Sequence, residues 1–189
     1  MSTMDQKQEE NYVDDDMIMG LDEDIDNLIY LSSSEGTVFS LKKKDALISV
    51  LITSFIEGDH SAGSTEDYPI TLKQVNTKNL ELIVEYMTFH EGKDEDIQPQ
   101  PVRSTDMKKV CQDPRDAVFC DKLITKDSTG NADLNLLFEI IMSSNYMDMK
   151  ALLYKLCAKV ATQLKGKKLE DIPKILKNVT RYENDEHKE

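Results

Sequence analysis

Short alternating apolar stretches mark the start of the folded part of the chain. Residues 28–31 and 37–41 read Leu-Ile-Tyr-Leu and Thr-Val-Phe-Ser-Leu, and the five residues between them end in Gly36. Glycine readily adopts the positive φ that a hairpin turn often needs. The pattern predicts a two-stranded hairpin that begins near Asn27.

Apolar residues spaced three and four apart predict two helices. The first covers residues 43–57, and the second runs from Asn76 or Thr77 to His90. The apolar residues of the first helix are Ala46, Leu47, Val50, Leu51 and Phe55, and those of the second are Leu80, Ile83, Val84 and Met87. Between the helices, residues 59–67 predict an exposed loop and residues 68–72 a short edge strand, because Pro69 cannot donate a backbone hydrogen bond.

Residues 91–130 predict a long connection, rich in acids and prolines, with a short helix around 118–123. Helical spacing then resumes. One helix carries Leu134, Leu137, Phe138, Ile141 and Met142, and the next carries Met149, Leu152, Leu153, Leu156, Val160 and Leu164. Gly166 closes the second helix, and a short third helix begins at about Asp171, so that Pro173 falls in its first turn.

The apolar stripe of the second of these helices is wider than one neighbouring helix needs. Such stripes usually belong to the core. The alternative is a groove that receives a partner's helix. The pattern alone leaves both open.

Charge separates the first 26 residues from the rest. They hold ten of the 36 Asp and Glu residues but one of the 23 Lys and Arg residues, so much of the net charge of −13 lies there. Such a segment buries too little apolar surface to offset the entropy of ordering. The acidity and the lack of a basic stripe argue against nucleic-acid binding.

Cysteine usage and hydropathy suggest the compartment. Cys111, Cys120 and Cys157 are odd in number and lack paired spacing, and no basic-plus-apolar signal precedes them. No apolar run approaches the ~18 residues of a membrane span. We expect a protein of a reducing compartment, cytoplasmic and nuclear, with no membrane contact.

Candidates for catalysis are few. His60, His90 and His187 lie in no recognisable motif, and we interpret them as solvent-exposed or helix-capping residues. Cys157 is interpreted as a small, buried or half-buried apolar residue. Neither clustered metal ligands nor a glycine-rich phosphate loop is present in the sequence, so we expect no metal, no cofactor and no enzymatic activity.

Three segments in the C-terminal half carry a family resemblance. They are LFEIIMSSNYMDMKALL at residues 137–153, CAKVA at 157–161 and LKGK at 164–167. In these segments the chain resembles the Skp family, the adaptor subunits of SCF-type cullin ubiquitin ligases. The likeness extends more weakly to the hairpin at 29–39 and the strand at 70–76. The related elongin C lacks the 157–167 motif, which favours Skp.

The resemblance implies a BTB/POZ-like α/β core with a C-terminal helical extension, acting as a non-catalytic adaptor. We expect a disordered tail over 1–26, a cullin-docking body over 27–147 with a flexible loop near 91–130, an F-box-binding extension over 148–178 and a frayed tail over 179–189. Asn145 and Tyr146 fall where the family meets the cullin. The positions that meet F-box helices are Leu152, Leu156, Cys157, Val160, Leu164 and Lys165.

Two alternatives to the adaptor remain. The fold could serve as a BTB-type interaction module in another assembly, such as a self-associating or chromosome-associated complex, and a homodimer could cover the docking face when no cullin is bound. A cryptic enzyme is the third hypothesis. Family members continue past the position of Asn178 with further helices, so the resemblance also implies a shortened F-box groove here.

Overall fold

A three-stranded sheet opens the fold in the computed structural model, which describes residues 27–93, 101–126, 128 and 132–176. Strand β1 (Leu28–Ser32) pairs antiparallel with β2 (Val38–Lys42) and parallel with the edge strand β3 (Ile70–Thr71). Gly36 has a φ of 85°, so the predicted hairpin and its turn are confirmed. The predicted third strand is shorter than expected, beginning after Pro69. The predicted tails over 1–26 and 179–189 lie outside the described residues.

The predicted helix over 43–57 is two helices, α2 (Lys43–Ala46) and α3 (Val50–Gly58). Ser49 separates them. Its backbone is extended, and its hydroxyl oxygen accepts a hydrogen bond from the Ile52 amide while donating one to the carbonyl oxygen of Met147 at 2.6 Å. A serine in this position caps the N-terminus of a new helix, which is why the first helix does not continue.

This break changes which face of α3 is buried. The predicted inward side chains Leu47, Val50 and Phe55 are 43%, 49% and 42% exposed. The buried residues of α3 are instead Ile52 and Ile56. The predicted apolar face is therefore wrong for α3, and three large apolar side chains lie on the surface.

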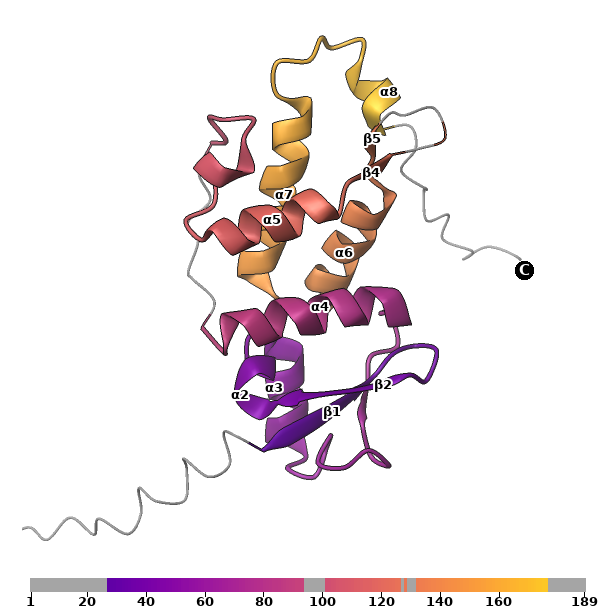
Figure 1. The fold of residues 1–189 in the computed structure, drawn as a ribbon. Helices are drawn as coiled ribbons and strands as arrows, with labels where there is room; N and C mark the ends of the chain where they lie inside the picture. The colour runs from indigo at the N-terminus through magenta and orange to yellow at the C-terminus, as the bar shows by residue number, and fades with distance from the viewer. Residues whose placement is uncertain (1–26, 94–100, 127, 129–131, 177–189) are drawn as a thin grey trace, which may run out of the picture.

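Helix α4 (Thr77–His90) crosses the middle of the molecule. It lies between the sheet with α2 and α3 on one side and helices α5 to α7 on the other (Figure 1). Its predicted bounds are confirmed: the Asn76 side chain accepts a hydrogen bond from the Asn79 amide at 2.8 Å, and Gly92 follows with a φ of 76°. A Cβ atom on Gly92 would lie 2.5 Å from the Lys44 carbonyl oxygen, so only glycine fits where the end of α4 meets α2.

The stretch near residues 91–130 is largely folded where the structure describes it. A 3-10 turn, η2 (Met107–Lys109), precedes helix α5 (Pro114–Lys122), which Asp113 caps. Strands β4 (Thr125–Lys126) and β5 (Ala132–Asp133) then pair. The short helix predicted around 118–123 is present as α5, which begins a few residues earlier, and the expectation of a flexible loop is wrong for this segment, because Ala117, Phe119 and Cys120 are buried in the core. Residues 94–100 lie outside the described part.

Three further helices follow, as predicted: α6 (Asn135–Tyr146), α7 (Lys150–Leu164) and the short α8 (Ile172–Leu176). The turn between α6 and α7 holds Asp148 at a φ of 49°. The Asp148 amide donates to the Asn145 carbonyl and the Met149 amide to the Ser144 carbonyl, at 3.1 and 3.0 Å, which is a Schellman cap.

A single core joins both halves of the described chain. Five fully buried side chains illustrate this: Leu31 of β1, Leu72 directly after β3, Ile83 of α4, Leu137 of α6 and Leu152 of α7. The predicted boundary between residues 147 and 148 thus falls at a turn within one packed unit. The predicted fold class, a small N-terminal sheet packed by helices with a helical C-terminal part, is confirmed.

Candidate docking surfaces

The histidines considered for catalysis lie in different environments. His60 is exposed in the loop after α3, and His187 lies outside the described residues. The interpretation of His90 as an exposed or capping residue is wrong, since its side chain is 5% exposed and its Nε2 atom lies 2.9 Å from the Asp116 carboxylate. The two described histidines therefore do not share a site.

The three thiols are all poor nucleophiles. Burial, together with the charge of the nearby Asp116 carboxylate, raises the pKa of Cys111 to about 11. Burial likewise raises the pKa of Cys120, and partial removal from water raises that of Cys157. A thiol reacts as its thiolate, so a raised pKa disfavours covalent chemistry at each of them. Cys157 is exposed, contrary to its expected burial.

A buried ionic cluster links α4, α5 and α7. One oxygen of the Asp116 carboxylate lies 2.9 Å from His90 Nε2, and the other lies 2.8 Å from Lys155 Nζ. Lys155 also donates a hydrogen bond to the Tyr86 hydroxyl at 3.0 Å. The side chains of Asp116 and Lys155 are 1% and 2% exposed.

Burial by itself would raise the pKa of Asp116, but the hydrogen bonds from His90 and Lys155 and the charge of Lys155 outweigh it and lower that pKa below its ordinary value. The carboxylate is therefore charged and compensated. One turn further along α7, Lys159 pairs with Asp121 at 2.5 Å. These pairs explain how α5 is held, and we assign the Asp116 cluster a structural role because Asp116, His90 and Lys155 are buried and paired with one another.

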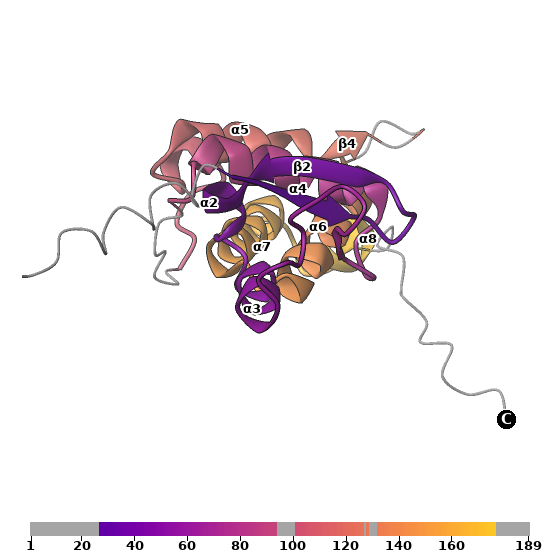
Figure 2. The same cartoon turned by 90° about the horizontal axis from the view of Figure 1, so that it is seen from below.

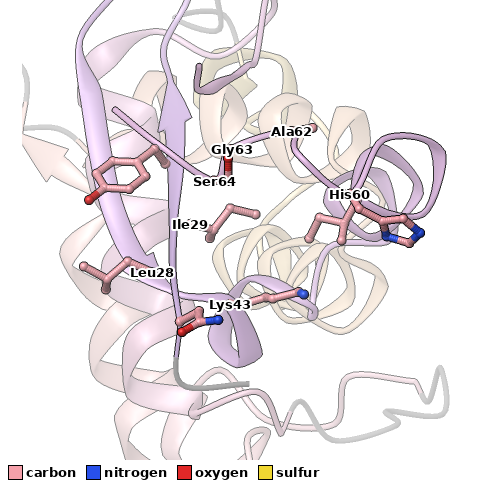
Figure 3. A pocket seen from close by; sticks show the side chains of 10 residues that line it. Leu28, Ile29, Lys43, His60, Ala62, Gly63 and Ser64 are labelled. Atoms are coloured by element: carbon pink, nitrogen blue, oxygen red, sulfur yellow. The ribbon is translucent and has the colours of Figure 1, made fainter. Parts of the chain in front are cut away.

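One cavity, of about 380 Å³, lies at the opposite end of the molecule. It is bordered by the first residues of β1, the start of α2 and the loop after α3. Figure 3 shows Ile29 and His60 on opposite sides of it, with Lys43 between them. The lining contains no cysteine and no carboxylate, and its ionisable side chains are Tyr30, Lys43 and His60.

The clearest surface feature is the α3 face, defined here as Leu47, Val50, Phe55, Asn145 and Tyr146. The hydrogen bond from Ser49 to Met147, together with one from the Leu51 amide to the same carbonyl, places the start of α3 beside the end of α6. Figure 2 shows α3 near the edge of the molecule when it is seen from below.

Both residues predicted to meet a cullin belong to this face. Asn145 is exposed and Tyr146 is half-buried against the core at the end of α6. The exposed apolar residues beside them were missed from the sequence, because their spacing suggested a buried stripe. The signal that could have found them is Ser49, a capping residue in the middle of the predicted helix.

The residues predicted to meet F-box helices divide into two groups. Leu152 and Leu156 are fully buried, so they belong to the core and do not offer a surface to a partner. Cys157 and Lys165 are exposed, and Val160 and Leu164 are half-buried. We call the second group, with the 82% exposed Leu169, the α7–α8 surface.

Two further properties concern the described residues as a whole. Each of their helices is too short or too polar to cross a membrane. Their His, Cys, Asp and Glu side chains nowhere form a group of three or more placed to hold a metal ion.

Comparison with known proteins finds one family, both by a family profile and by individual relatives. A family profile described as "Skp1 family, tetramerisation domain" matches residues 27–92, which contain the sheet and helices α2 to α4. The SCF ubiquitin ligase complex protein SKP1a of Dictyostelium discoideum is 34% identical over 150 residues, covering 79% of this chain and 82% of that protein.

Two other relatives are similarly close. The E3 ubiquitin ligase complex SCF subunit sconC of Arthroderma benhamiae is 32% identical over 153 residues, covering 78% of this chain and 81% of its own length. The S-phase kinase-associated protein 1 homolog of Tetrahymena thermophila is 33% identical over 146 residues, covering 77% of this chain and 79% of that protein. Each of the three similarities covers more than three quarters of both proteins.

Proposed function

Because this chain belongs to the Skp1 family, we propose that it is a subunit of an SCF ubiquitin ligase complex, in which it links a cullin scaffold to F-box substrate receptors and catalyses no step itself. The names of its relatives in Dictyostelium and Arthroderma support membership of such a complex. The raised pKa values of its thiols and the separation of its described histidines support a non-catalytic role.

The observation that carries the proposal is the α3 face. Three large apolar side chains of this face, each more than 40% exposed, lie just after α2 and on α3, and Ser49 at the start of α3 is hydrogen-bonded to Met147, which follows Asn145 and Tyr146 in the chain. Grouped apolar side chains on a surface mark protein-interaction sites. A tyrosine adds an apolar ring with a polar tip, a combination enriched at interfaces. The cullin docks on this face.

The F-box receptor docks on the α7–α8 surface. This surface lies at the far end of the molecule from the α3 face, beyond α4 (Figure 1). A protein with two separate surfaces can hold two partners at once, as an adaptor must. In this role the protein works in the cytoplasm and nucleus, which fluorescence microscopy of the tagged chain would test.

The experiment compares single charge insertions on the two surfaces. Phe55→Glu removes an apolar contact and buries a carboxylate in the cullin interface, so the affinity for the cullin is expected to fall at least tenfold while F-box binding is unchanged. Cys157→Glu is expected to have the reverse pattern. Purified full-length variants, titrated separately with a cullin N-terminal domain and an F-box protein, provide the two affinities.

Val118→Glu is the matched control, because Val118 is 60% exposed on α5, away from the α3 face. It should bind both partners normally. Circular dichroism and thermal melting of all three variants exclude unfolding as the cause of a loss. Wild-type affinity of the Phe55→Glu variant for the cullin would contradict the placement of that interface, and absence of both partners from the native complex would reject the adaptor role.

Self-association through the α3 face is a second function that the same exposed side chains favour. An apolar face left open would be covered in a homodimer when no cullin is present. Light scattering coupled to size exclusion would then show a concentration-dependent dimer for the wild-type protein and a monomer for Phe55→Glu. A wild-type monomer at all concentrations would reject it.

A further inference from the structure

Six exposed basic side chains from two separate segments gather near the C-terminal end of α7. Three come from the segment before α5 and three from the turn after α7. Together they form what we call the basic patch: Arg103, Lys108, Lys109, Lys165, Lys167 and Lys168.

Specific contacts bring the two segments together. The Lys165 ammonium donates a hydrogen bond to the Val102 carbonyl at 3.1 Å, which places Arg103 next to the end of α7. Met107 is 2% exposed and anchors the η2 turn in the core, so that Lys108 and Lys109 are held on its outer side. Figure 1 shows this segment beside the upper half of α7. Tertiary contacts therefore hold the two segments of the patch next to each other.

The charge of the patch is not neutralised by neighbouring carboxylates. Among the described residues, none of its six members takes part in an ion pair, and the acids near them in the chain are Asp106, Glu170 and Asp171. The bases of α5 and the middle of α7 behave differently, since each has a carboxylate partner. These paired bases are Arg115, Lys122, Lys155 and Lys159.

A positive patch is conspicuous on a chain with a net charge of −13. It adjoins the α7–α8 surface, where Leu164 is half-buried and Leu169 is 82% exposed. Apolar anchors next to unpaired bases fit a segment that combines apolar residues with carboxylates. A purely apolar partner would leave these ammonium groups next to the interface without a counter-charge.

We propose that the basic patch binds an acidic segment of the protein that docks on the α7–α8 surface, with the carboxylates of that segment flanking its apolar anchors. The proposal rests on the proposed function, because it takes the F-box receptor as the protein that carries this segment. It adds the chemical class that the docking segment must have.

The expected effect is moderate, because the six side chains are solvent-exposed. Exposed ion pairs contribute little individually and are screened by salt. Complementary charge at the rim of an interface acts mainly on the association rate. We expect the patch to raise the association rate and affinity roughly tenfold at low salt, and this gain to be lost as salt rises.

The test uses the full-length chain and two labelled peptides, one with glutamates between leucines and one in which glutamines replace the glutamates. Fluorescence polarisation should show tighter binding of the glutamate peptide, and Lys167→Glu/Lys168→Glu should abolish the difference. The control Lys73→Glu/Lys78→Glu changes the net charge equally, at two exposed lysines outside the patch, and should preserve it.

The same variants are then titrated with an F-box protein. A weaker, less salt-dependent interaction for Lys167→Glu/Lys168→Glu than for the control supports the proposal. Equal binding by both variants overturns the basic patch while leaving the adaptor role intact, whereas an F-box protein that does not bind even the wild-type chain rejects the adaptor role. Equal affinity for the two peptides, or preference for a single-stranded DNA oligonucleotide over the glutamate peptide, also overturns the proposal.

Discussion

Neutralising Asp116 is expected to destabilise this protein more than any surface substitution. Asp116→Asn keeps the shape of the side chain but removes the negative charge that compensates Lys155, whose side chain is 2% exposed and whose ammonium lies 2.8 Å from the carboxylate. Breaking a buried ion pair from one side costs about 3–5 kcal/mol, because an uncompensated charge stays buried. The Tyr86 hydroxyl, 3.0 Å away, and the amide that asparagine supplies offset part of this. We expect a loss of about 3 kcal/mol in the free energy of unfolding.

The double variant Asp116→Asn/Lys155→Met separates charge from packing. Methionine fills a similar volume without a charge, so the buried ammonium that made the single change costly is gone. Its loss should be about 1–2 kcal/mol, mainly from the weaker partner left to His90. The coupling energy between the two positions is then at least about 1–2 kcal/mol.

Urea denaturation of the full-length variants, followed by circular dichroism at neutral pH, measures these free energies. Asp113→Asn serves as the control. It weakens the surface pair between Asp113 and Arg115, whose side chains are 21% and 60% exposed, and asparagine still caps α5. Its cost should stay below about 1 kcal/mol. If Asp116→Asn costs no more than this control, or if the double variant loses the full sum of both single changes, the cluster is not a compensated buried ion pair.

Three further expectations concern the backbone and the pH. Gly92→Ala should lower the free energy of unfolding, measured by urea titration, by about 3 kcal/mol. The new Cβ atom would lie 2.5 Å from the Lys44 carbonyl oxygen, and alanine would have to adopt a left-handed φ of 76°. Unchanged stability would refute this explanation of the turn. Asp148→Gly should raise it by about 0.5–1 kcal/mol, because glycine adopts a φ of 49° without strain, and a loss of stability would show that the Asp148 side chain matters more than its backbone. The lowered pKa of Asp116 contributes stability at pH values above its unfolded pKa of about 3.9. The urea concentration at the unfolding midpoint should therefore fall as the pH drops below about 4, through the folded pKa. This dependence of the midpoint on pH should be weaker in Asp116→Asn.

Local sequence signals predicted the elements whose ends are set by one or two residues. Gly36 marks the hairpin turn, Asn76 and Gly92 delimit α4, and Gly166 follows α7, as the structure has them. These residues act through backbone conformation and capping, which depend on near neighbours in the chain. The sequence is sufficient for such features.

The surfaces could not be predicted in the same way, because burial depends on which element packs against which. Ser49 interrupts the helical period, so the side chains of α3 that looked inward face the solvent. In α7 the reverse occurs. Lys155 and Lys159 lie among the apolar residues of the predicted helix, and they are buried against carboxylates of α5, a partner that the spacing of apolar residues in α7 does not reveal. A pattern of apolar residues cannot reveal a core that contains matched charges.

The burial of these two lysines has a consequence for acyl transfer to the protein itself. An amine must reach solvent and lose its proton before it can attack a thioester or an activated ester. The ammonium groups of Lys155 and Lys159 are 2% and 8% exposed as side chains, and each is bound to a carboxylate. Conjugation in the middle of α7, where an attached chain would separate the helices that hold the fold together, is thereby disfavoured.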